Sequence, residues 1–320
     1  MTFKNKNILV TGGAGFIGSN LIKRLLETGA NIRATLHSKD IVIEDPKIEY
    51  GWFCDLQRPF DCRKVCEGMD YIFLCAANTS GAAVMENTPL AHLTPNIIMN
   101  TLMLEAAYAA DVQKVLFISS NSIYPLTDYP VAEEDANFEF FEKYFIVGWM
   151  KRFTEIMCEM YSTKIKKPLQ TIVIRPANIY GPMDDFEWET SHVLPAMIRR
   201  VVERHDPIEV WGDGKDIKDF IYIDDFIDGI ILAMDHINSF DILNIASGQM
   251  YCLKDLLNII LKLDGYENAR IQYDTSKPTM IPKRLINPSK AKRLLGFSAT
   301  TPIEEGLRKT IDWYRGTLNA

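Results

Sequence analysis

A membrane-spanning helix needs about 18 to 20 consecutive apolar residues, and no run in this 320-residue chain approaches that length. Long basic runs are also missing. The net charge is −7 with a pI near 5.4, so neither a nucleic acid nor an anionic membrane is an expected partner. The six cysteines lack the paired spacing of a zinc site, so no metal is expected, and reduced thiols of a cytoplasmic protein are predicted. The amino-terminal segment does not have the pattern of a signal peptide, because its short apolar stretch leads directly into a glycine turn.

That glycine turn is the strongest positive signal in the chain. The apolar run Ile8–Val10 predicts a strand, the segment TGGAGFIG follows, and the apolar spacing of Leu21–Leu26 predicts a helix. In such a unit Gly12 permits the tight turn, Gly15 leaves room for a diphosphate at the helix N-terminus, and Gly18 lets helix and strand pack closely. The unit therefore predicts a dinucleotide-binding site.

Strand and helix patterns alternate through the first half of the chain, and 47% hydrophobic residues supply an ample core. The predicted strands are Asn7–Thr11, Asn31–Leu36, Ile48–Tyr50, Tyr71–Cys75, Val115–Ser119 and Thr171–Arg175. The predicted helices are Phe16–Glu27, Phe60–Cys66, Pro95–Ala110 and Phe145–Lys164. This order predicts an α/β fold with a doubly wound parallel sheet of the Rossmann type, in which ligands bind beyond the carboxyl ends of the strands.

After Pro176 the alternation stops. The later predicted helices are Val193–Glu203, Asp225–Met234, Leu253–Lys262, Ser289–Leu295 and Ile303–Tyr314, and the later predicted strands are Asp219–Ile223 and Leu243–Ile245. We expect a dinucleotide-binding domain at residues 1–176 together with about 220–247. A smaller, mostly helical substrate lobe is expected at residues 177–219 and 248–320.

The segment after the second strand, Ala34–Lys39, lacks the acidic residue that would bind the ribose hydroxyls of NAD. Basic and hydroxyl side chains stand there instead: Arg33, His37, Ser38 and Lys39. They favour the 2′-phosphate of NADP, so NADP is the preferred cofactor. The alternative is that Asp40 or a backbone group serves NAD.

Further motifs are spread along the chain. Besides the glycine turn they are Cys54-Asp55-Leu56, Cys75-Ala76-Ala77, SSNSIYP from Ser119, RPANIYGP from Arg175, VWGDG from Val210 and FIYIDD from Phe220. Together they resemble the extended short-chain dehydrogenases/reductases, in particular the NAD-dependent epimerase/dehydratase family of nucleotide-sugar enzymes, over nearly the whole length. Three more segments are similar to the GDP-fucose synthase branch of that family: DDF from Asp184, SHVLPA from Ser191 and IPKRL from Ile281.

The resemblance implies which residues hold the cofactor. Besides the glycines of the turn and His37, they are Phe16, Ile17, Asp55, Leu56, Ala76, Ala77 and Lys151. Asp55 and Leu56 would hold the adenine end, and Ala76 and Ala77 would lie near the ribose and the diphosphate. Lys151 takes the place of the family lysine that bonds the nicotinamide ribose.

The resemblance also implies catalytic and substrate-binding roles. Ser120 takes the place of the catalytic serine, which bonds the sugar oxygen that is oxidised or reduced. His192 matches the epimerisation acid/base of the synthase, but it could equally be a structural residue at a helix start. The implied substrate contacts are Ser122, Asn178, His192, Lys218 and Arg284. Among them, Asn178 would touch the sugar nucleotide, and Lys218 falls where an arginine commonly meets the diphosphate.

One departure from the family concerns the proton donor. The family uses Tyr-x-x-x-Lys on one helix, so that the ammonium lowers the pKa of the phenol and the phenol exchanges a proton with the sugar oxygen. Here Val147 stands four residues before Lys151, and valine cannot transfer a proton. Tyr144 is near the same helical face but about 4.5 Å further along the axis than the usual partner. Tyr144 is a candidate acid if the helix start is distorted, and otherwise an ordinary buried or capping tyrosine.

A second departure lies at Asn121 and Ser122, where dehydratases carry an aspartate and a glutamate and the synthase carries a cysteine at the second position. We therefore predict a nucleotide-sugar reductase or epimerase with redox chemistry at the sugar C4, ahead of a 4,6-dehydratase. Some dehydratases of the superfamily also replace the tyrosine, so that alternative stays open. Val147 also suggests another class, a cofactor-binding regulatory or scaffold subunit with little or no turnover, although the other site residues are retained.

The predicted helix Phe145–Lys164 has apolar residues on more than one face: Phe145, Ile146, Trp149, Phe153, Ile156, Met157 and Met160. In the resembling family, a related pair of helices forms the four-helix bundle of a dimer. We therefore expect a homodimer. The alternative is a helix buried on both sides within one subunit.

Overall fold

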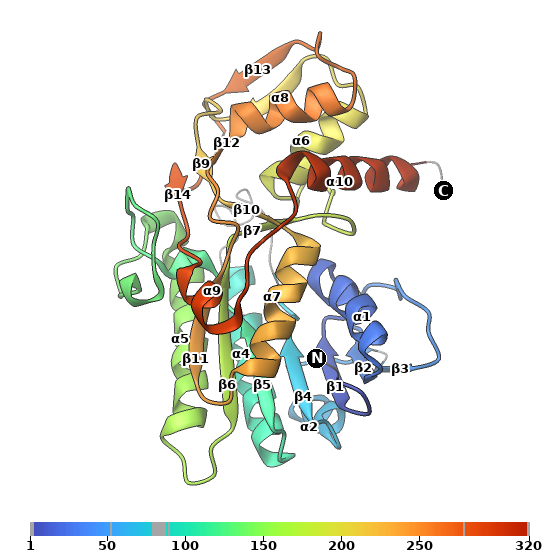
Figure 1. Cartoon of the computed structure of the whole chain (residues 1–320), viewed down its shortest axis with the longest axis vertical. Coiled ribbons are helices and arrows are strands. Elements are labelled where there is room, and N and C mark those ends of the chain that lie inside the picture. The colour runs from blue at the N-terminus through green and yellow to red at the C-terminus, as the bar shows by residue number, and fades with distance from the viewer. Residues whose placement is uncertain (1–2, 52, 79–87, 89, 278, 319–320) are drawn as a thin grey trace.

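The computed structural model describes residues 3–51, 53–78, 88, 90–277 and 279–318. Its largest element is a seven-stranded sheet in which every neighbouring pair is parallel (Figure 1). In spatial order the strands are β11 (Asp241–Ile245), β6 (Gln170–Pro176), β5 (Lys114–Ile118), β4 (Tyr71–Leu74), β1 (Asn7–Thr11), β2 (Asn31–Thr35) and β3 (Ile48–Gly51). The predicted parallel sheet of the Rossmann type is confirmed.

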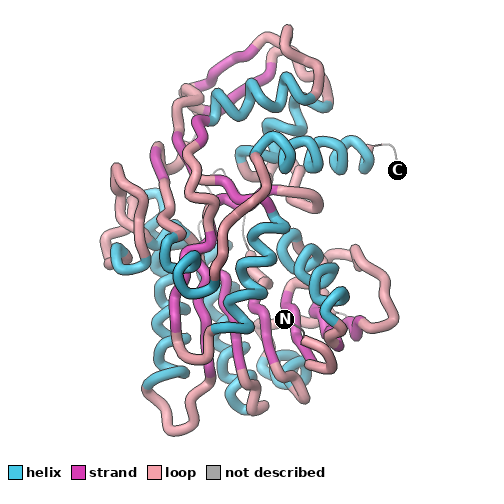
Figure 2. The backbone as a smooth tube through the Cα atoms, viewed as in Figure 1, coloured by secondary structure: helices cyan, strands magenta, loops and turns pink. Residues whose placement is uncertain are grey.

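Helices cover both faces of this sheet (Figure 2). They are α1 (Phe16–Thr28), α2 (Pro59–Cys66), α4 (Leu90–Ala109), α5 (Phe145–Thr163) and α7 (Ile223–His236). The two faces have separate cores, one with α1 and α7 and the other with α2, α4 and α5. In β1, Ile8 and Val10 belong to the first core and Leu9 to the second, and all three are fully buried. Burial on both faces is why this strand is a continuous apolar run.

One predicted helix boundary is wrong. The helix expected to begin at Pro95 begins at Leu90, so Pro95 lies inside α4. A proline has no N–H to donate to the carbonyl four residues before it, which here is that of Ala91. The side-chain amide of Asn78 donates to the Ala91 oxygen instead, at 3.0 Å. A tertiary contact thus satisfies the carbonyl and lets the helix extend through the proline.

The remaining segments form a smaller lobe at the carboxyl ends of the strands (Figure 1). Its helices are α6 (Val193–Val202), α8 (Leu253–Leu263) and α10 (Ile303–Thr317), and α9 (Ser289–Leu295) lies beside β11. The lobe also contains three short sheets: β7 (Asn178–Tyr180) with β10 (Phe220–Tyr222), β12 (Tyr251–Cys252) with β9 (Ile217–Lys218) and β14 (Lys283–Arg284), and β8 (Ile208–Trp211) with β13 (Ile271–Asp274). The expected helices are therefore accompanied by strands.

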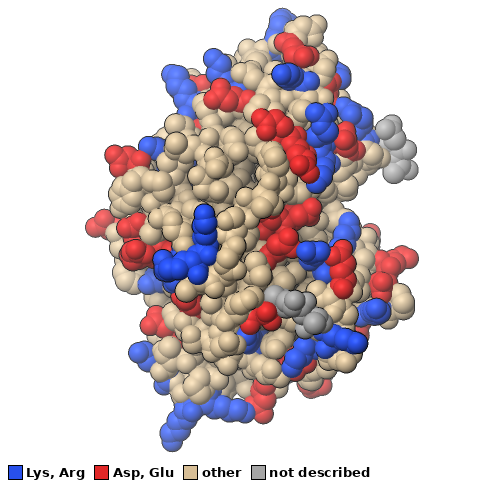
Figure 3. Space-filling view, in the orientation of Figure 1, with Lys and Arg blue, Asp and Glu red and all other residues tan. Residues whose placement is uncertain are grey.

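The surface in this orientation is indented between α10 and α1, where the smaller lobe meets the sheet domain (Figure 3). Basic and acidic side chains are interspersed on this face, with no continuous basic area. None of the helices described here is long and apolar enough to cross a membrane.

Candidate active site

The candidate cleft lies where the strand order of the sheet reverses. The chain runs from β1 outward through β2 to β3 and then returns to β4 on the other side of β1, and ligands of α/β sheets bind at such a crevice. Thr11 ends β1, and its hydroxyl accepts hydrogen bonds from the backbone amides of Cys75 and Ala76, both at 3.0 Å. The turns that follow β1 and β4 are therefore held side by side.

The three glycines of the first turn meet different steric demands. Gly12 has a φ of +69°, and a Cβ there would lie 2.9 Å from the Cα of Ala76. A Cβ at Gly18 would lie 2.2 Å from the backbone oxygen of Gly12, so only glycine lets α1 pack against the turn. A Cβ at Gly15 would have a single described neighbour within 4 Å, the same oxygen at 3.2 Å. Gly15 therefore borders open space.

The N-terminus of α1 is available to an anion. Its N-cap is Gly15, which offers no side chain to the first backbone amides, and its first turn contains no acidic residue. Phe16 and Ile17 form this turn and are half-buried. Unpaired N–H groups and the positive end of the helix dipole thus face the space beside Gly15. This arrangement fits the diphosphate of a dinucleotide.

The loop after β3 lies against the end of β2, where the adenine end of a dinucleotide is expected. The amide of Cys54 donates to the oxygen of Leu36 at 2.8 Å. Asp55 is half-buried, and its carboxylate accepts the amide of Gln57 at 3.0 Å, while Leu56 is buried. The expected adenine contacts therefore lie together at this edge.

Of the residues expected to contact the 2′-phosphate of NADP, some are exposed and one is already paired with other residues. His37, Ser38 and Lys39 are exposed beyond the end of β2. Arg33 pairs with Glu49 at 2.9 Å and donates to two further carbonyls at the opposite side of the strand. The guanidinium of Arg33 is therefore already paired in this structure, and its contribution to a 2′-phosphate site stays a prediction.

Ser120 follows β5 at the carboxyl edge of the sheet. It caps the short 3₁₀ helix η1 (Asn121–Ile123), and its Oγ accepts the amide of Ser122 at 3.1 Å. Ser122 is buried, and its own hydroxyl has no hydrogen-bond partner among the described residues. The Ser120 hydroxyl accepts in this contact and donates to no other described group, so its proton is available to a ligand.

Lys151 reaches the same edge of the sheet from α5. Its Nζ donates to the oxygen of Ile118, the last residue of β5, at 2.8 Å and lies 4.9 Å from the centre of the Phe117 ring. Burial lowers the pKa of Lys151 to about 8, and the nearby Glu155 and Cys75 oppose that shift. Burial also raises the pKa of the Cys75 thiol to about 12, with Lys151 opposing, so the amine and the thiol are neighbours.

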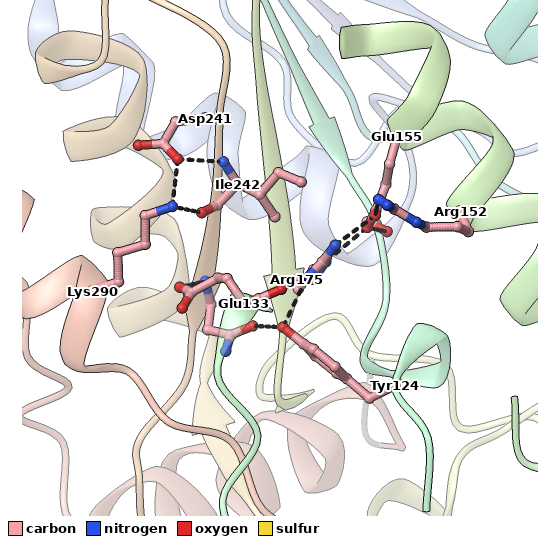
Figure 4. Close-up of polar contacts among 10 residues, drawn as sticks. Tyr124, Glu133, Arg152, Glu155, Arg175, Asp241, Ile242 and Lys290 are labelled. Carbon is pink, nitrogen blue, oxygen red and sulfur yellow. Dashed lines mark hydrogen bonds and ion pairs between the residues drawn. The ribbon is translucent and has the colours of Figure 1, made fainter. Parts of the chain in front are cut away.

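Glu155 lies one turn after Lys151 and is the centre of a buried network (Figure 4). Its two oxygens accept from Nε and NH2 of Arg175 at 2.9 and 2.7 Å, and one also accepts from Arg152 at 2.9 Å. The hydroxyl of Ser119 donates to Glu155 at 2.6 Å. Two arginines therefore neutralise this carboxylate, and it ties α5 to β6 and to the turn that carries Ser120.

The position one turn before Lys151 holds the half-buried Val147. Tyr144 is the N-cap of α5. Burial raises the pKa of Tyr144 to about 12, and the Arg284 guanidinium and the amide of Ile281 oppose that rise. These neighbours place its hydroxyl against the smaller lobe, and no hydrogen bond within the described part of the chain joins it to Lys151.

His192 occupies the N-cap of α6, but its side chain makes no capping hydrogen bond. The residue is exposed, and desolvation lowers the pKa of His192. The charge of Asp185 opposes this lowering, and that of His92 adds to it.

Two buried polar residues in this region were not among the predicted site residues, although Asp184 opens the DDF segment noted in the sequence. His92 lies in the first turn of α4 and is 2% exposed, and its Nε2 has no partner among the residues described. The Oδ2 atom of Asp184 is likewise unpartnered, and burial raises the pKa of Asp184 to about 8. Unpaired buried polar atoms are rare in folded proteins. Nothing in the spacing of a single histidine or of adjacent aspartates marks them beforehand.

The expected substrate contacts Asn178 and Lys218 lie in the smaller lobe. The Asn178 side chain donates to the oxygen of Asp219 at 2.8 Å. The Lys218 ammonium is buried, pairs with Asp216 at 2.8 Å and donates to the oxygen of Ile281 at 3.2 Å. The charge of Lys218 is thus already partly balanced.

Arg284 is buried beneath the segment that follows η1. It donates to the carbonyls of Tyr124 and Pro125 at 3.0 and 2.9 Å, and its Nε has no described partner. Burial lowers the pKa of Arg284 to about 10. The Tyr124 hydroxyl donates to Asn244 at 2.6 Å and accepts from Arg175 at 3.1 Å, so this tyrosine is fully engaged (Figure 4).

Known proteins resemble this chain in sequence and in structure. The model of a family described as the NAD dependent epimerase/dehydratase family matches residues 8–246. A probable GDP-L-fucose synthase 1 from Oryza sativa subsp. japonica is 29% identical over 97% of this chain and 92% of its own. A GDP-mannose 3,5-epimerase 1 from the same plant is 29% identical over 96% of this chain and 81% of its own. The crystal structure of a UDP-glucose 4-epimerase with UDP-glucose from Thermotoga maritima is 27% identical, with a TM-score of 0.87 over 98% of this chain and 99% of that one.

Proposed function

Because the chain belongs to the NAD-dependent epimerase/dehydratase family, we propose that it is an NAD(P)-dependent reductase or epimerase of a nucleoside-diphosphate sugar, with redox chemistry at the sugar C4. The observation that carries this proposal is the position of Ser120 and Lys151 at the carboxyl edge of the sheet that also carries the glycine turn, with β4 between β5 and β1. The turn fits a dinucleotide, and the two polar side chains fit a sugar alcohol or ketone placed next to it.

The cofactor would supply or accept the hydride when bound. The α1 N-terminus would hold its diphosphate, Asp55 and Leu56 its adenine end, and Lys151 its nicotinamide ribose. His37 and Lys39 remain as support for NADP over NAD, because they are exposed at the end of β2 and no acidic residue stands between them. Residues 1–176 with about 220–247 would serve the cofactor in this scheme.

The sugar nucleotide would lie against the lobe formed by residues 177–219 and 248–320. Asn178, Lys218 and Arg284 would contact it there, with His192 and Ser122 nearer the sugar. The printed names of two relatives contain GDP-L-fucose and GDP-mannose, so GDP-sugars are the first candidates. A reductase or epimerase is favoured over a 4,6-dehydratase because Asn121 and Ser122 of η1 carry no carboxylate.

A second candidate function is a cofactor-binding protein with little or no turnover. Val147 favours it, because the usual proton donor is replaced by a side chain without a proton to exchange. The retained Ser120, Asn178 and His192 favour the enzyme, because binding of the dinucleotide alone needs none of these three side chains.

We further propose a homodimer formed through α4 and α5. On α5, Phe145, Trp149, Phe153 and Met160 are between 39% and 50% exposed. The alternative that α5 is buried on both sides within one subunit is therefore wrong. Contiguous exposed apolar side chains of this kind typically mark a protein interface.

The six cysteines are all free thiols, which supports the expected cytoplasmic location.

The test combines binding with turnover. The purified protein is first titrated with NADPH and NADH, and nicotinamide fluorescence reports binding. It is then mixed with either cofactor in both redox states and with UDP-, GDP-, CDP- and dTDP-sugars, including 4-keto sugars. Absorbance detects net reduction, and sugar NMR detects epimerisation, which leaves the cofactor unchanged.

The outcomes separate the two candidates. Conversion of any nucleotide sugar supports the enzyme. Cofactor binding without conversion favours the non-catalytic candidate. Failure to bind either cofactor would contradict both.

A further inference from the structure

The proposed reaction needs a group that takes a hydroxyl proton when the sugar alcohol is oxidised and returns it when the ketone is reduced. The position that usually holds this group is taken by Val147, four residues before Lys151 on α5. Two tyrosines, Tyr124 and Tyr144, are near enough in the sequence to be considered as substitutes.

Both tyrosines are engaged away from the amine. The Tyr124 side chain is completely buried, donates to Asn244 and accepts from Arg175. The Tyr144 hydroxyl lies among groups of the smaller lobe, beside Arg284. In the described part of the chain neither hydroxyl has a hydrogen bond to Lys151.

The Lys151 amine, in contrast, lies between the carboxyl ends of two adjacent strands. It donates to Ile118 at the end of β5 and neighbours Cys75, the first residue after β4. An ammonium has three N–H groups, and Ile118 is its single hydrogen-bond partner among the residues that the structure describes. Two positions on this nitrogen remain for a ligand, at the edge where ligands of such sheets bind.

No carboxylate among the described residues forms an ion pair with the Lys151 amine. Glu155 lies one turn away, but its oxygens are taken by Arg152, Arg175 and Ser119. The Phe117 ring and the neutral Cys75 thiol complete the surroundings. A buried ammonium without a carboxylate partner is disfavoured relative to the neutral amine. The lowered pKa of Lys151, about 8, agrees with this environment.

On the basis of the proposed function, we propose that the Lys151 amine is itself the proton-transfer group. In oxidation the sugar O–H bond breaks and its proton moves to the lone pair of Nζ, while the C–H bond breaks and its electron pair leaves as hydride. The hydride would pass to a bound oxidised nicotinamide, the sugar carbon would become a ketone, and the amine would become an ammonium. Reduction of a ketone reverses each transfer.

A measurement without substrate or cofactor tests the ionisation. Protein labelled with ¹³C-lysine is titrated by NMR, and Lys151→Met identifies the Lys151 signal. We expect that signal to titrate near pH 8, well below the ordinary value of 10.5. A midpoint at about 10, as for an exposed lysine, would overturn the proposal.

Turnover of variants tests the chemistry. Lys151→Arg keeps a cation for the ribose but cannot release a proton. We expect its kcat to fall by about 10² to 10⁴, with cofactor affinity retained. Adding Val147→Tyr should restore part of the turnover, because a phenol then stands one turn before the cation. Circular dichroism and cofactor titration establish that the variants fold.

The matched control is Lys114→Arg, which enlarges another buried lysine. Lys114 lies at the amino end of β5, and its Nζ donates to the oxygen of Met234 at 3.0 Å. This control and Tyr144→Phe should both retain turnover. Retained turnover in Lys151→Arg, or its loss in Tyr144→Phe, would assign the proton transfer to another group. A wild-type protein that binds the cofactor and converts no nucleotide sugar would remove the proposed function, and this role with it.

Discussion

Adding one methyl group at two neighbouring glycines should separate cofactor binding from folding. Gly15→Ala places its Cβ in a backbone conformation that any residue adopts (φ −86°, ψ 168°), with one described neighbour at 3.2 Å. We expect it to cost less than about 1 kcal/mol of folding free energy, the small difference between glycine and alanine at an N-cap. The methyl group would nevertheless stand where the diphosphate approaches α1, so cofactor affinity should fall by about 10-fold or more, or about 1.4 kcal/mol.

Gly18→Ala should instead lower the stability of the ligand-free fold. Its Cβ would lie 2.2 Å from the Gly12 oxygen and 2.9 Å from the Gly12 carbonyl carbon. Relief of this overlap requires α1 to move by roughly 1 Å away from the turn, and overpacking of that kind costs about 1 to 3 kcal/mol. For a chain of this size each kcal/mol corresponds to a fall in Tm of roughly 2 to 4 °C.

The assay is thermal unfolding of the ligand-free variants, together with fluorescence titration with NADPH and NADH. Gly15→Ala should unfold within about 3 °C of the wild type and bind the cofactor poorly. Gly18→Ala should unfold at a clearly lower temperature before any cofactor is added. Wild-type cofactor affinity in Gly15→Ala would refute the assignment of the open space beside Gly15 to a diphosphate.

Three further predictions concern other regions. Burial raises the pKa of the Asp184 carboxyl to about 8 in the native state, against 3.8 ordinarily, so its contribution to the stability of the fold decreases as the pH rises between those values. In urea unfolding, Asp184→Asn should therefore stabilise the protein more at pH 8 than at pH 5. An effect of the substitution that does not change with pH would contradict this. Glu155→Gln leaves the buried Arg175 without its carboxylate partner and should lower the free energy of unfolding by about 3 to 5 kcal/mol in the same assay. A decrease below about 1 kcal/mol, as for a surface ion pair, would show that the network does not hold α5 in place. Light scattering should give twice the chain mass of 36.5 kDa for the wild type and the single mass for Phe153→Arg; a monomeric wild type would refute the dimer.

The sheet and the glycine turn could be predicted because their signals are local. The β1 strand is a continuous apolar run because both of its faces are buried, and Gly12 and Gly18 stand where a side chain would overlap the backbone. The valine at position 147, four residues before Lys151, is also visible in the sequence alone. Such features need no knowledge of which distant segments meet.

The remainder depends on contacts between segments far apart in the chain. The start of α4 depends on Asn78, which satisfies the carbonyl freed by Pro95. The guanidinium of Arg33 is paired because Glu49 lies beside it in the next strand. The short strands of the smaller lobe, such as β9 with β12 and β14, contain two residues each and have no periodicity to detect. The direction of the Tyr144 hydroxyl follows from the position of Arg284, which lies in one of these strands.

Two contacts of α5, four residues apart, end on different strands of the sheet. Lys151 is bonded to Ile118 on β5, and Glu155 is bonded to Arg175 on β6. The helix rises 1.5 Å per residue, so a slip of even one residue would break both contacts together. A change in the length of the segment before α5 must therefore be taken up in that loop, and the amine keeps its place. Insertions and deletions in this loop should accordingly be tolerated by the chemistry, whereas insertions within the helix between Lys151 and Glu155 should not.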